Sequence, residues 1–235
     1  MTQPLVFITG ASSGIGQALA LRFHQAGYRL ALAARRTSEV KSWADAHQIS
    51  ASSYEIYSAD VAVMDSIVAA GAECIARQGL PDVVIANAGI SVGMDTAVRD
   101  DLDVMARTFA TNNLGLAATF HPFAQGMTER RSGTLVGIAS VAGIRGLPGH
   151  GAYCASKAAV ISYCESLRGE MRPFGVRVVT LSPGYIDTPL TRSNRYNMPF
   201  QKQPEDFAER ACQSLGPGFS SIGTPCQIGV VGNSP

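Results

Sequence analysis

Short apolar runs and helical repeats alternate along the 235-residue chain from its first residues. Apolar runs bounded by glycine or polar residues predict buried strands; they lie at 4–9, 29–34, 54–59, 82–88, 133–140 and 176–182. Apolar residues at helical spacing predict helices between these strands and after the last one, over 16–27, 38–48, 64–78, 100–130, 151–172 and 203–215. The alternation predicts a single α/β domain over residues 1–235, a doubly wound parallel sheet of Rossmann type with helices on both faces.

The end of the chain has a different character. No charged residue occurs after Arg210, and residues 216–235 are rich in Gly, Ser and Pro. Residues 227–231 could form a short strand. We expect the remainder of this atypical uncharged tail to be weakly ordered.

Composition narrows the classes of partner. The net charge of +1 gives no sign of a nucleic-acid partner. No apolar run approaches the ~18 residues of a membrane span, and the first residues lack the basic region of a signal peptide. Five scattered cysteines without a CxxC spacing indicate a reducing cytoplasmic compartment. The four histidines form no close pair, so we expect no metal site.

A glycine cluster, TGASSGIG, lies between the first strand and the first helix. Unpaired N–H groups and the positive dipole end at a helix N-terminus suit a phosphate. Glycines such as Gly10, Gly14 and Gly16 let a pyrophosphate approach the backbone. Their spacing differs from the common G-x-G-x-x-G fingerprint, and a tight turn without a ligand is the alternative interpretation.

The end of the second strand refines the choice of nucleotide. An acidic residue at this place would bind a ribose 2′-hydroxyl, but the chain has Arg35 and Arg36. Guanidinium groups pair well with phosphate, so the pair favours a 2′-phosphate and therefore NADP. A solvated basic pair at a strand end is the alternative.

Tyr153 and Lys157 are four residues apart in a predicted helix, so their side chains should face the same way. A phenol with a pKa of about 10 must become more acidic to exchange protons near neutral pH. We expect the Lys157 ammonium, with a cationic nicotinamide, to lower the pKa of Tyr153. Alone, the pair is more often a core tyrosine with a surface lysine than a functional pair.

Together these features resemble the short-chain dehydrogenase/reductase family, in its shorter-chain branch. The matches run from residue 5 to about 190: TGASSGIG, Asp60–Val61, Asn87–Gly89, Asn112–Gly115, Ser140, Tyr153 with Lys157, and Ser182–Thr188. The resemblance implies four catalytic residues, Asn112, Ser140, Tyr153 and Lys157. Tyr153 would act as general acid or base, and Ser140 would bind the substrate oxygen. Lys157 would hold the ribose and lower the pKa of Tyr153, and Asn112 would position a water.

The resemblance also implies NADP as the cofactor. Its binding residues would be Gly10, Ser12, Ser13, Gly14, Ile15, Gly16, Arg35, Arg36, Asp60, Val61, Asn87, Ala88, Gly89, Tyr153, Lys157, Pro183, Gly184, Ile186 and Thr188. Asp60 and Val61 would contact the adenine, and Thr188 would contact the carboxamide.

Residues 190–203 occupy the place of the family's substrate lid. The family resemblance favours a homodimer through the helices at 100–130 and 151–172, whereas the absent GG end makes a tetramer doubtful. The expected function is an NADP(H)-dependent carbonyl reductase or alcohol dehydrogenase acting on a small molecule. A catalytically inactive NADP-binding regulator or scaffold on the same fold is the alternative.

Overall fold

The computed structural model describes residues 3–192, 200–215 and 228–230. Its sheet has the order β3-β2-β1-β4-β5-β6-β7. The strands are β1 (Leu5–Thr9), β2 (Arg29–Ala34), β3 (Tyr54–Ser58), β4 (Val83–Ala86), β5 (Gly133–Ile138), β6 (Val176–Pro183) and β7 (Ile228–Val230). The first six strands are parallel, as predicted. The strand order reverses between β1 and β4, which opens a crevice at their carboxyl ends.

The seventh strand departs from the parallel arrangement predicted for the whole sheet. Ile228 pairs with Pro183, the last residue of β6, and Val230 pairs with Leu181. The chain therefore starts β7 at the carboxyl end of β6 and runs back along it, antiparallel. The predicted strand at 227–231 exists in a shorter form.

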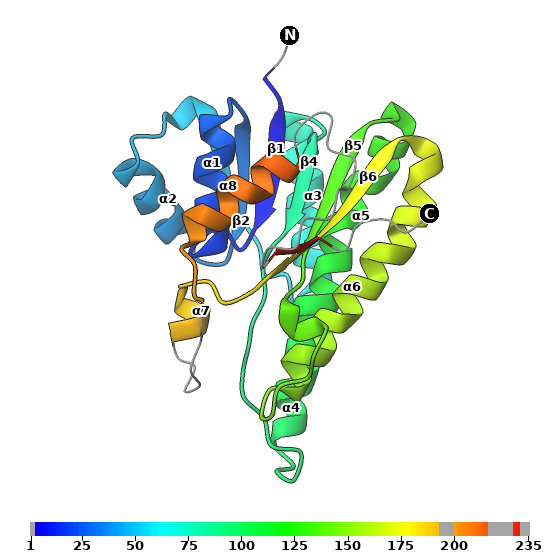
Figure 1. Cartoon of the computed structure of the whole chain (residues 1–235). Helices are drawn as coiled ribbons and strands as arrows, with labels where there is room; N and C mark the ends of the chain where they lie inside the picture. Colours follow the sequence, from blue (N-terminus) through cyan, green and yellow to red (C-terminus); the bar gives the residue numbers. More distant parts are fainter. Residues whose placement is uncertain (1–2, 193–199, 216–227, 231–235) are drawn as a thin grey trace.

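Helices cover both faces of the sheet (Figure 1). They are α1 (Ile15–Gln25), α2 (Thr37–Ala46), α3 (Met64–Gln78), α4 (Asp101–Phe109), α5 (Gly115–Arg130), α6 (Gly151–Met171), α7 (Pro189–Arg192) and α8 (Pro204–Leu215). Figure 1 shows α1, α2 and α8 on one face and α3, α5 and α6 on the other, with α4 projecting below the sheet. An ion pair between Arg22 and Glu209 joins α1 to α8.

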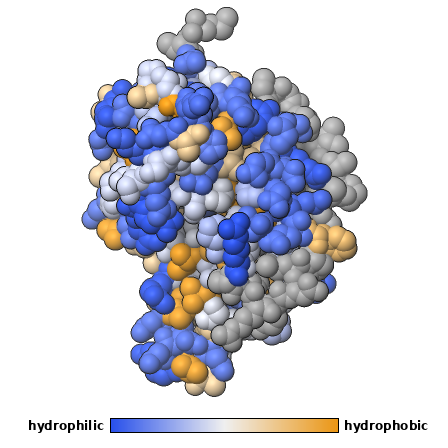
Figure 2. Space-filling view, turned by 90° about the vertical axis from the view of Figure 1, so that its left-hand side faces the viewer, coloured by the Kyte–Doolittle hydropathy of each residue, from blue (hydrophilic) through white to orange (hydrophobic). Residues whose placement is uncertain are grey.

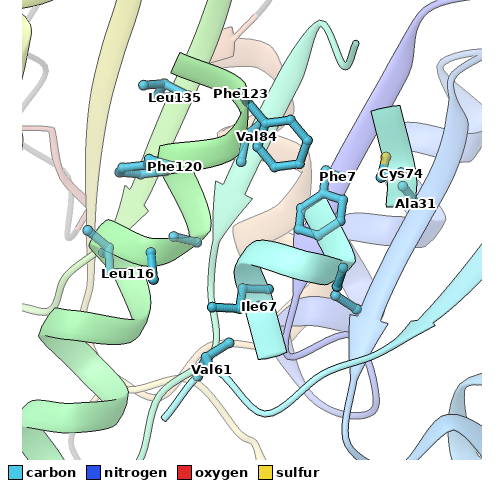
Figure 3. Close-up of a cluster of buried hydrophobic side chains, with 14 of the residues drawn as sticks. Phe7, Ala31, Val61, Ile67, Cys74, Val84, Leu116, Phe120, Phe123 and Leu135 are labelled. Atoms are coloured by element: carbon cyan, nitrogen blue, oxygen red, sulfur yellow. The ribbon is translucent and has the colours of Figure 1, made fainter. Parts of the chain in front are cut away.

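Two apolar cores, one on each face, account for the continuous apolar runs of the strands. In β1, Phe7 packs in the core with α3 and α5, and its neighbour Ile8 packs in the core with α1 and α8. Successive side chains of a strand point to opposite faces, so a strand covered on both sides is apolar throughout. Figure 3 shows Phe7 and Phe123 side by side in the first core, and their ring centroids are 4.9 Å apart.

The predicted helix over 100–130 is interrupted. Between α4 and α5 the chain makes one π-helical turn, Ala110–Leu114, which contains Asn112. A π turn holds one more residue than an α turn and leaves the helical path continuous. The prediction was therefore right about the span and wrong about the regularity.

The predicted lid and tail are only partly described. The structure does not describe residues 193–199 of the predicted lid, nor residues 216–227 and 231–235 of the tail. The prediction that the tail is weakly ordered therefore falls mostly on residues outside the described part. Within the described part of the chain, no helix has the length and apolarity needed to cross a membrane. In the side view of Figure 2, hydrophobic residues gather between the largely hydrophilic main body and the projecting lower end.

Candidate active site

A cleft of about 320 Å³ lies at the carboxyl ends of the central strands. It brings together most of the predicted cofactor residues: Gly10, Ser12, Ser13, Gly14, Ile15, Arg35, Arg36, Asp60, Val61, Asn87, Ala88, Gly89, Tyr153, Lys157, Pro183 and Thr188. These residues come from both halves of the sheet, and they meet because the strand order reverses between β1 and β4.

Three predicted cofactor residues lie outside the lining of this cleft. A Cβ on Gly16 would lie 2.2 Å from the carbonyl oxygen of Gly10, so this glycine permits close packing of the loop on α1. Gly184 lines a second cavity, described below. Ile186 is buried and its backbone bridges to Lys202, so its side chain belongs to the core.

The loop from Gly10 to Gly14 has the geometry of an anion cradle. Gly10 and Gly14 adopt φ of 69° and 56°, a left-handed region that favours glycine. Gly14 is the N-cap of α1, and no side chain caps the helix there. The first amides of α1 are therefore without a side-chain acceptor beside the cleft, which suits the phosphates of a dinucleotide.

A threonine that the sequence analysis left out of its residue set holds this loop in place. The Thr9 hydroxyl accepts hydrogen bonds from the backbone N–H groups of Asn87 and Ala88, both at 3.1 Å. Asn87 Nδ2 in turn donates to the carbonyl of Thr9 at 2.9 Å. The two strand ends on either side of the crevice are thus bonded to each other. The signals in the sequence were its place at the end of an apolar strand and as the first residue of TGASSGIG.

Both predicted arginines lie at the edge of the cleft. Arg36 donates to Ser12 Oγ at 3.2 Å and pairs with Glu39 at 2.9 Å. Arg35 lies 3.6 Å from a carboxylate oxygen of Asp60. The side chains of Arg35 and Arg36 are 67% and 55% exposed, so both can turn toward a bound anion. The serine contacts keep Arg36 next to the glycine loop.

Tyr153 and Lys157 face the same side of α6, as the spacing predicts. The Lys157 ammonium lies 5.8 Å from the centroid of the Tyr153 ring and donates to the carbonyl of Ile138 at 2.8 Å. Burial lowers the pKa of Lys157 from 10.5 to about 8. The lysine therefore remains largely protonated at neutral pH.

Without a bound nicotinamide the pKa of Tyr153 is raised, and the expected lowering by the Lys157 ammonium together with a cationic nicotinamide stays a prediction. Burial raises the pKa of the Tyr153 phenol above its ordinary value of 10.0, and a hydrogen bond with the Ser140 side chain lowers it by less. The Lys157 ammonium donates instead to the carbonyl of Ile138. The phenol is accordingly protonated at neutral pH.

Asn112 is buried in the π turn. Its Nδ2 donates to the carbonyl of Ile90 at 3.0 Å and to Ser156 Oγ at 2.9 Å, and its Oδ1 accepts from the N–H of Ile90 at 2.9 Å. The side-chain amide is thus engaged by protein groups and does not line the cleft. The positioning of a water by Asn112, which the family resemblance implied, stays a prediction.

Ser156 is a second residue absent from the predicted set. It is fully buried, accepts from Asn112 and donates to the carbonyl of Tyr153 at 2.7 Å. It therefore connects the π turn to the first turn of α6. A small polar residue between Tyr153 and Lys157 was a possible signal, because that face of the helix is buried.

Beside the cleft lies a second cavity of about 400 Å³, which we call the outer pocket. It is lined by Ser91, Gly93, Ser140, Val141, Ala142, Arg145, Leu147, His150, Tyr153, Gly184, Tyr185, Leu190 and Thr191. Tyr153 lines both cavities, and Ser140 lines the outer pocket. A small molecule in the outer pocket can therefore reach the phenol that also borders the cleft.

Comparisons with known proteins agree with this arrangement. A family model described as "short chain dehydrogenase" matches residues 4–199. An "Uncharacterized oxidoreductase" of Myxococcus xanthus is 36% identical over 230 residues, which cover 98% of this chain and 90% of the relative. Several other curated relatives are longer, and the match covers only 58–60% of their length.

Two solved structures show the same architecture. The 3-ketoacyl-(acyl-carrier-protein) reductase of Brucella melitensis, complexed with NADH, aligns with a TM-score of 0.83 and 25% identity, covering 93% of each chain. A structure titled "ElxO with NADP Bound" aligns with a TM-score of 0.85 over 94% of each chain, and its 22% identity shows the fold alone.

Proposed function

The chain belongs to the short-chain dehydrogenase family, and from this premise we propose that it is an NADP(H)-dependent oxidoreductase acting on a carbonyl or alcohol substrate. One observation carries the proposal. Tyr153 forms part of the wall of both cavities, with Ser140 in the wall of the outer pocket and Lys157 next to it in the wall of the cleft. A proton donor placed between a dinucleotide cleft and a small-molecule pocket suits carbonyl reduction.

When bound, the nicotinamide supplies the hydride. The protein's own groups handle the proton and the oxygen of the substrate. Because burial raises the pKa of Tyr153, the phenol is in the protonated form that a general acid requires. The Ser140 hydroxyl is within hydrogen-bonding reach of the phenol and would donate to the same substrate oxygen as negative charge develops there.

The preference for NADP rests on Arg35 and Arg36 at the cleft edge. The cleft also carries an acidic group, Asp60, but this carboxylate is within ion-pairing distance of Arg35. A 2′-phosphate would meet two exposed guanidinium groups beside the serines of the glycine loop. The NADH complex of the Brucella melitensis reductase shows that the family also uses the other cofactor, so the choice needs a direct test.

The remaining expectations form part of the same proposal. The described cysteines are free, which supports a reducing, cytoplasmic location. Residues 190–203 would close over the outer pocket, to which Leu190 and Thr191 already contribute. A homodimer would form through α4–α5 and α6.

The test is NADPH oxidation with a panel of aldehydes, ketones and quinones, using wild type and Tyr153→Phe. We expect turnover by the wild type, and a loss of about 10²–10⁴-fold in kcat for the variant, because the positioned acid is removed. The Kd for NADPH, measured by fluorescence, should stay within about twofold. Tight NADPH binding without turnover by the wild type would overturn the proposal and favour the inactive regulator or scaffold.

A further inference from the structure

We propose that the outer pocket selects carbonyl substrates that carry an anionic group, and that Arg145 is the residue that binds this group. The inference rests on the proposed function and specifies its substrate class. It begins from the charge distribution of the lining. Among the described lining residues there is one arginine and no Asp or Glu.

Arg145 lies in the segment between the short helix Val141–Gly143 and α6. It is exposed and lines the outer pocket. It forms no ion pair with any carboxylate of the described residues, whereas Arg22, Arg35, Arg36, Arg77, Arg130 and Arg192 all do. Its positive charge is thus uncompensated within the described protein, at the edge of a cavity that also contains Ser140 and Tyr153.

The helix behind the pocket adds to the same polarity. His150, the N-cap of α6, lines the outer pocket, and α6 is 21 residues long. The amino-terminal end of a long helix carries partial positive charge. An anion in the pocket would therefore be attracted by both the guanidinium and the helix terminus.

The other walls define the rest of the ligand. Val141, Leu147 and Leu190 are apolar, and they are 37%, 38% and 39% exposed. Burying them requires an apolar part of the ligand. The substrate class that fits is a small molecule with its carbonyl at Tyr153 and Ser140, an apolar middle, and a carboxylate or phosphate at Arg145.

The experiment compares 4-carboxybenzaldehyde with methyl 4-formylbenzoate, two aldehydes of similar shape that differ in charge. We expect Arg145→Gln to raise KM for the anionic aldehyde about fivefold, the upper range for an exposed ion pair. In the same variant, kcat for both aldehydes and KM for the neutral ester should change by less than about twofold. Arg145→Lys should recover part of the effect, and added salt should raise the wild-type KM for the anion only.

Arg172→Gln is the matched control, because Arg172 is exposed and lies outside the cavities described here. It removes the same charge and should leave both KM values unchanged. Equal KM shifts for the two aldehydes in Arg145→Gln, or no shift for the anion, would overturn the inference while leaving the proposed function intact.

Binding without turnover separates the two proposals from the other side. In Tyr153→Phe with NADPH, titration calorimetry should give a lower Kd for 4-carboxybenzaldehyde than for the ester, and Arg145→Gln added to this variant should abolish the difference. If the wild type shows no turnover but this charge-selective binding is observed, the role of Arg145 in binding the anionic group is supported and hydride transfer is rejected. Equal affinities for the two aldehydes would reject the role of Arg145.

Discussion

Burial of the Lys157 ammonium makes the free energy of unfolding depend on pH. The side chain is 5% exposed, and its pKa falls from 10.5 to about 8. A lowered pKa means that, between about pH 8 and 10.5, the unfolded chain binds a proton that the native protein has released. Native stability therefore rises with pH through this window, by the linkage between proton binding and folding.

The prediction concerns the difference between wild type and Lys157→Met. The free energy of unfolding of the wild type, measured by urea denaturation, should gain about 2 kcal/mol relative to the variant between pH 7 and pH 9.5. Other titrating groups cancel because they occur in both proteins. Lys41→Met, on the exposed side of α2, should show no such relative change. A constant difference between wild type and Lys157→Met would contradict the assigned pKa.

The two arginines at the cleft edge make the cofactor preference testable. Replacing Arg35 and Arg36 together by alanine should weaken NADPH binding about tenfold or more, because two charge-assisted contacts to a phosphate are lost. NADH lacks that phosphate, so its Kd should change by less than about threefold. Fluorescence titration of both nucleotides measures this. Equal weakening of the two would show that the arginines act on the fold of the loop and not on the phosphate.

At the scale of elements, the segment after β5 is fixed to the backbone of α6 by a glycine. A Cβ on Gly143 would lie 2.7 Å from the carbonyl carbon of Lys157 and 2.8 Å from the N of Ala158. Both are main-chain atoms of a helix and cannot move aside cheaply. We expect this contact to set how closely Ser140, three residues earlier, approaches Tyr153.

Gly143→Ala should therefore displace Ser140 from the phenol. We expect kcat to fall at least tenfold and the free energy of unfolding to fall by about 1–3 kcal/mol, as for other overpacked sites. Gly146→Ala is the matched control in the same segment, because nothing lies within 4 Å of the added Cβ. Enzyme assays and urea denaturation of the two variants test this; similar kcat values for both would refute the positioning role of Gly143.

The elements that the sequence predicted best are the strands that are buried on both faces. Strands covered on both faces become continuous apolar runs, so β1, β2 and β6 were found nearly to the residue. The π turn was not found, because Ala110–Leu114 contains residues that an ordinary helix also accepts. The antiparallel direction of β7 depends on where the tail returns to the sheet, and local periodicity carries no information about that.

In the candidate site, too, some residues could be predicted from the sequence and others could not. Residues with distinctive chemistry, such as Tyr153, Lys157 and the arginine pair, were assigned from spacing and family motifs. Thr9 and Ser156 were missed because a hydroxyl that bonds backbone or amide groups looks like any small polar residue in the sequence. The direction of the Tyr153 pKa could not be predicted, because desolvation depends on surroundings that only the folded chain provides.

For the whole molecule, the predicted homodimer has a physical basis in exposed apolar side chains. Met105 on α4, Leu114 in the π turn and Tyr163 on α6 are 38%, 54% and 39% exposed. Helices α4 and α6 pack against each other, so these side chains offer apolar area on neighbouring elements. Covering them would remove that area from water.

Met105→Glu should convert the predicted dimer to a monomer, because a carboxylate would be buried without a partner. Analytical ultracentrifugation at micromolar concentration measures the change. Val63→Glu, at a position that is 54% exposed before α3, should leave the mass unchanged. A wild type that sediments as a monomer would refute the dimer.

The π turn has one more consequence. Removing one residue from 110–114 would let an ordinary α-helix run from Asp101 to the end of α5. The residues after the deletion would keep their orientation, because the π turn takes up its extra residue within one turn of the helix, and Phe120 and Phe123 would still face the core. The change would therefore be local: we expect the deletion to disturb the Asn112 amide and its contacts with Ile90 and Ser156, while the apolar stripe farther along stays in the core.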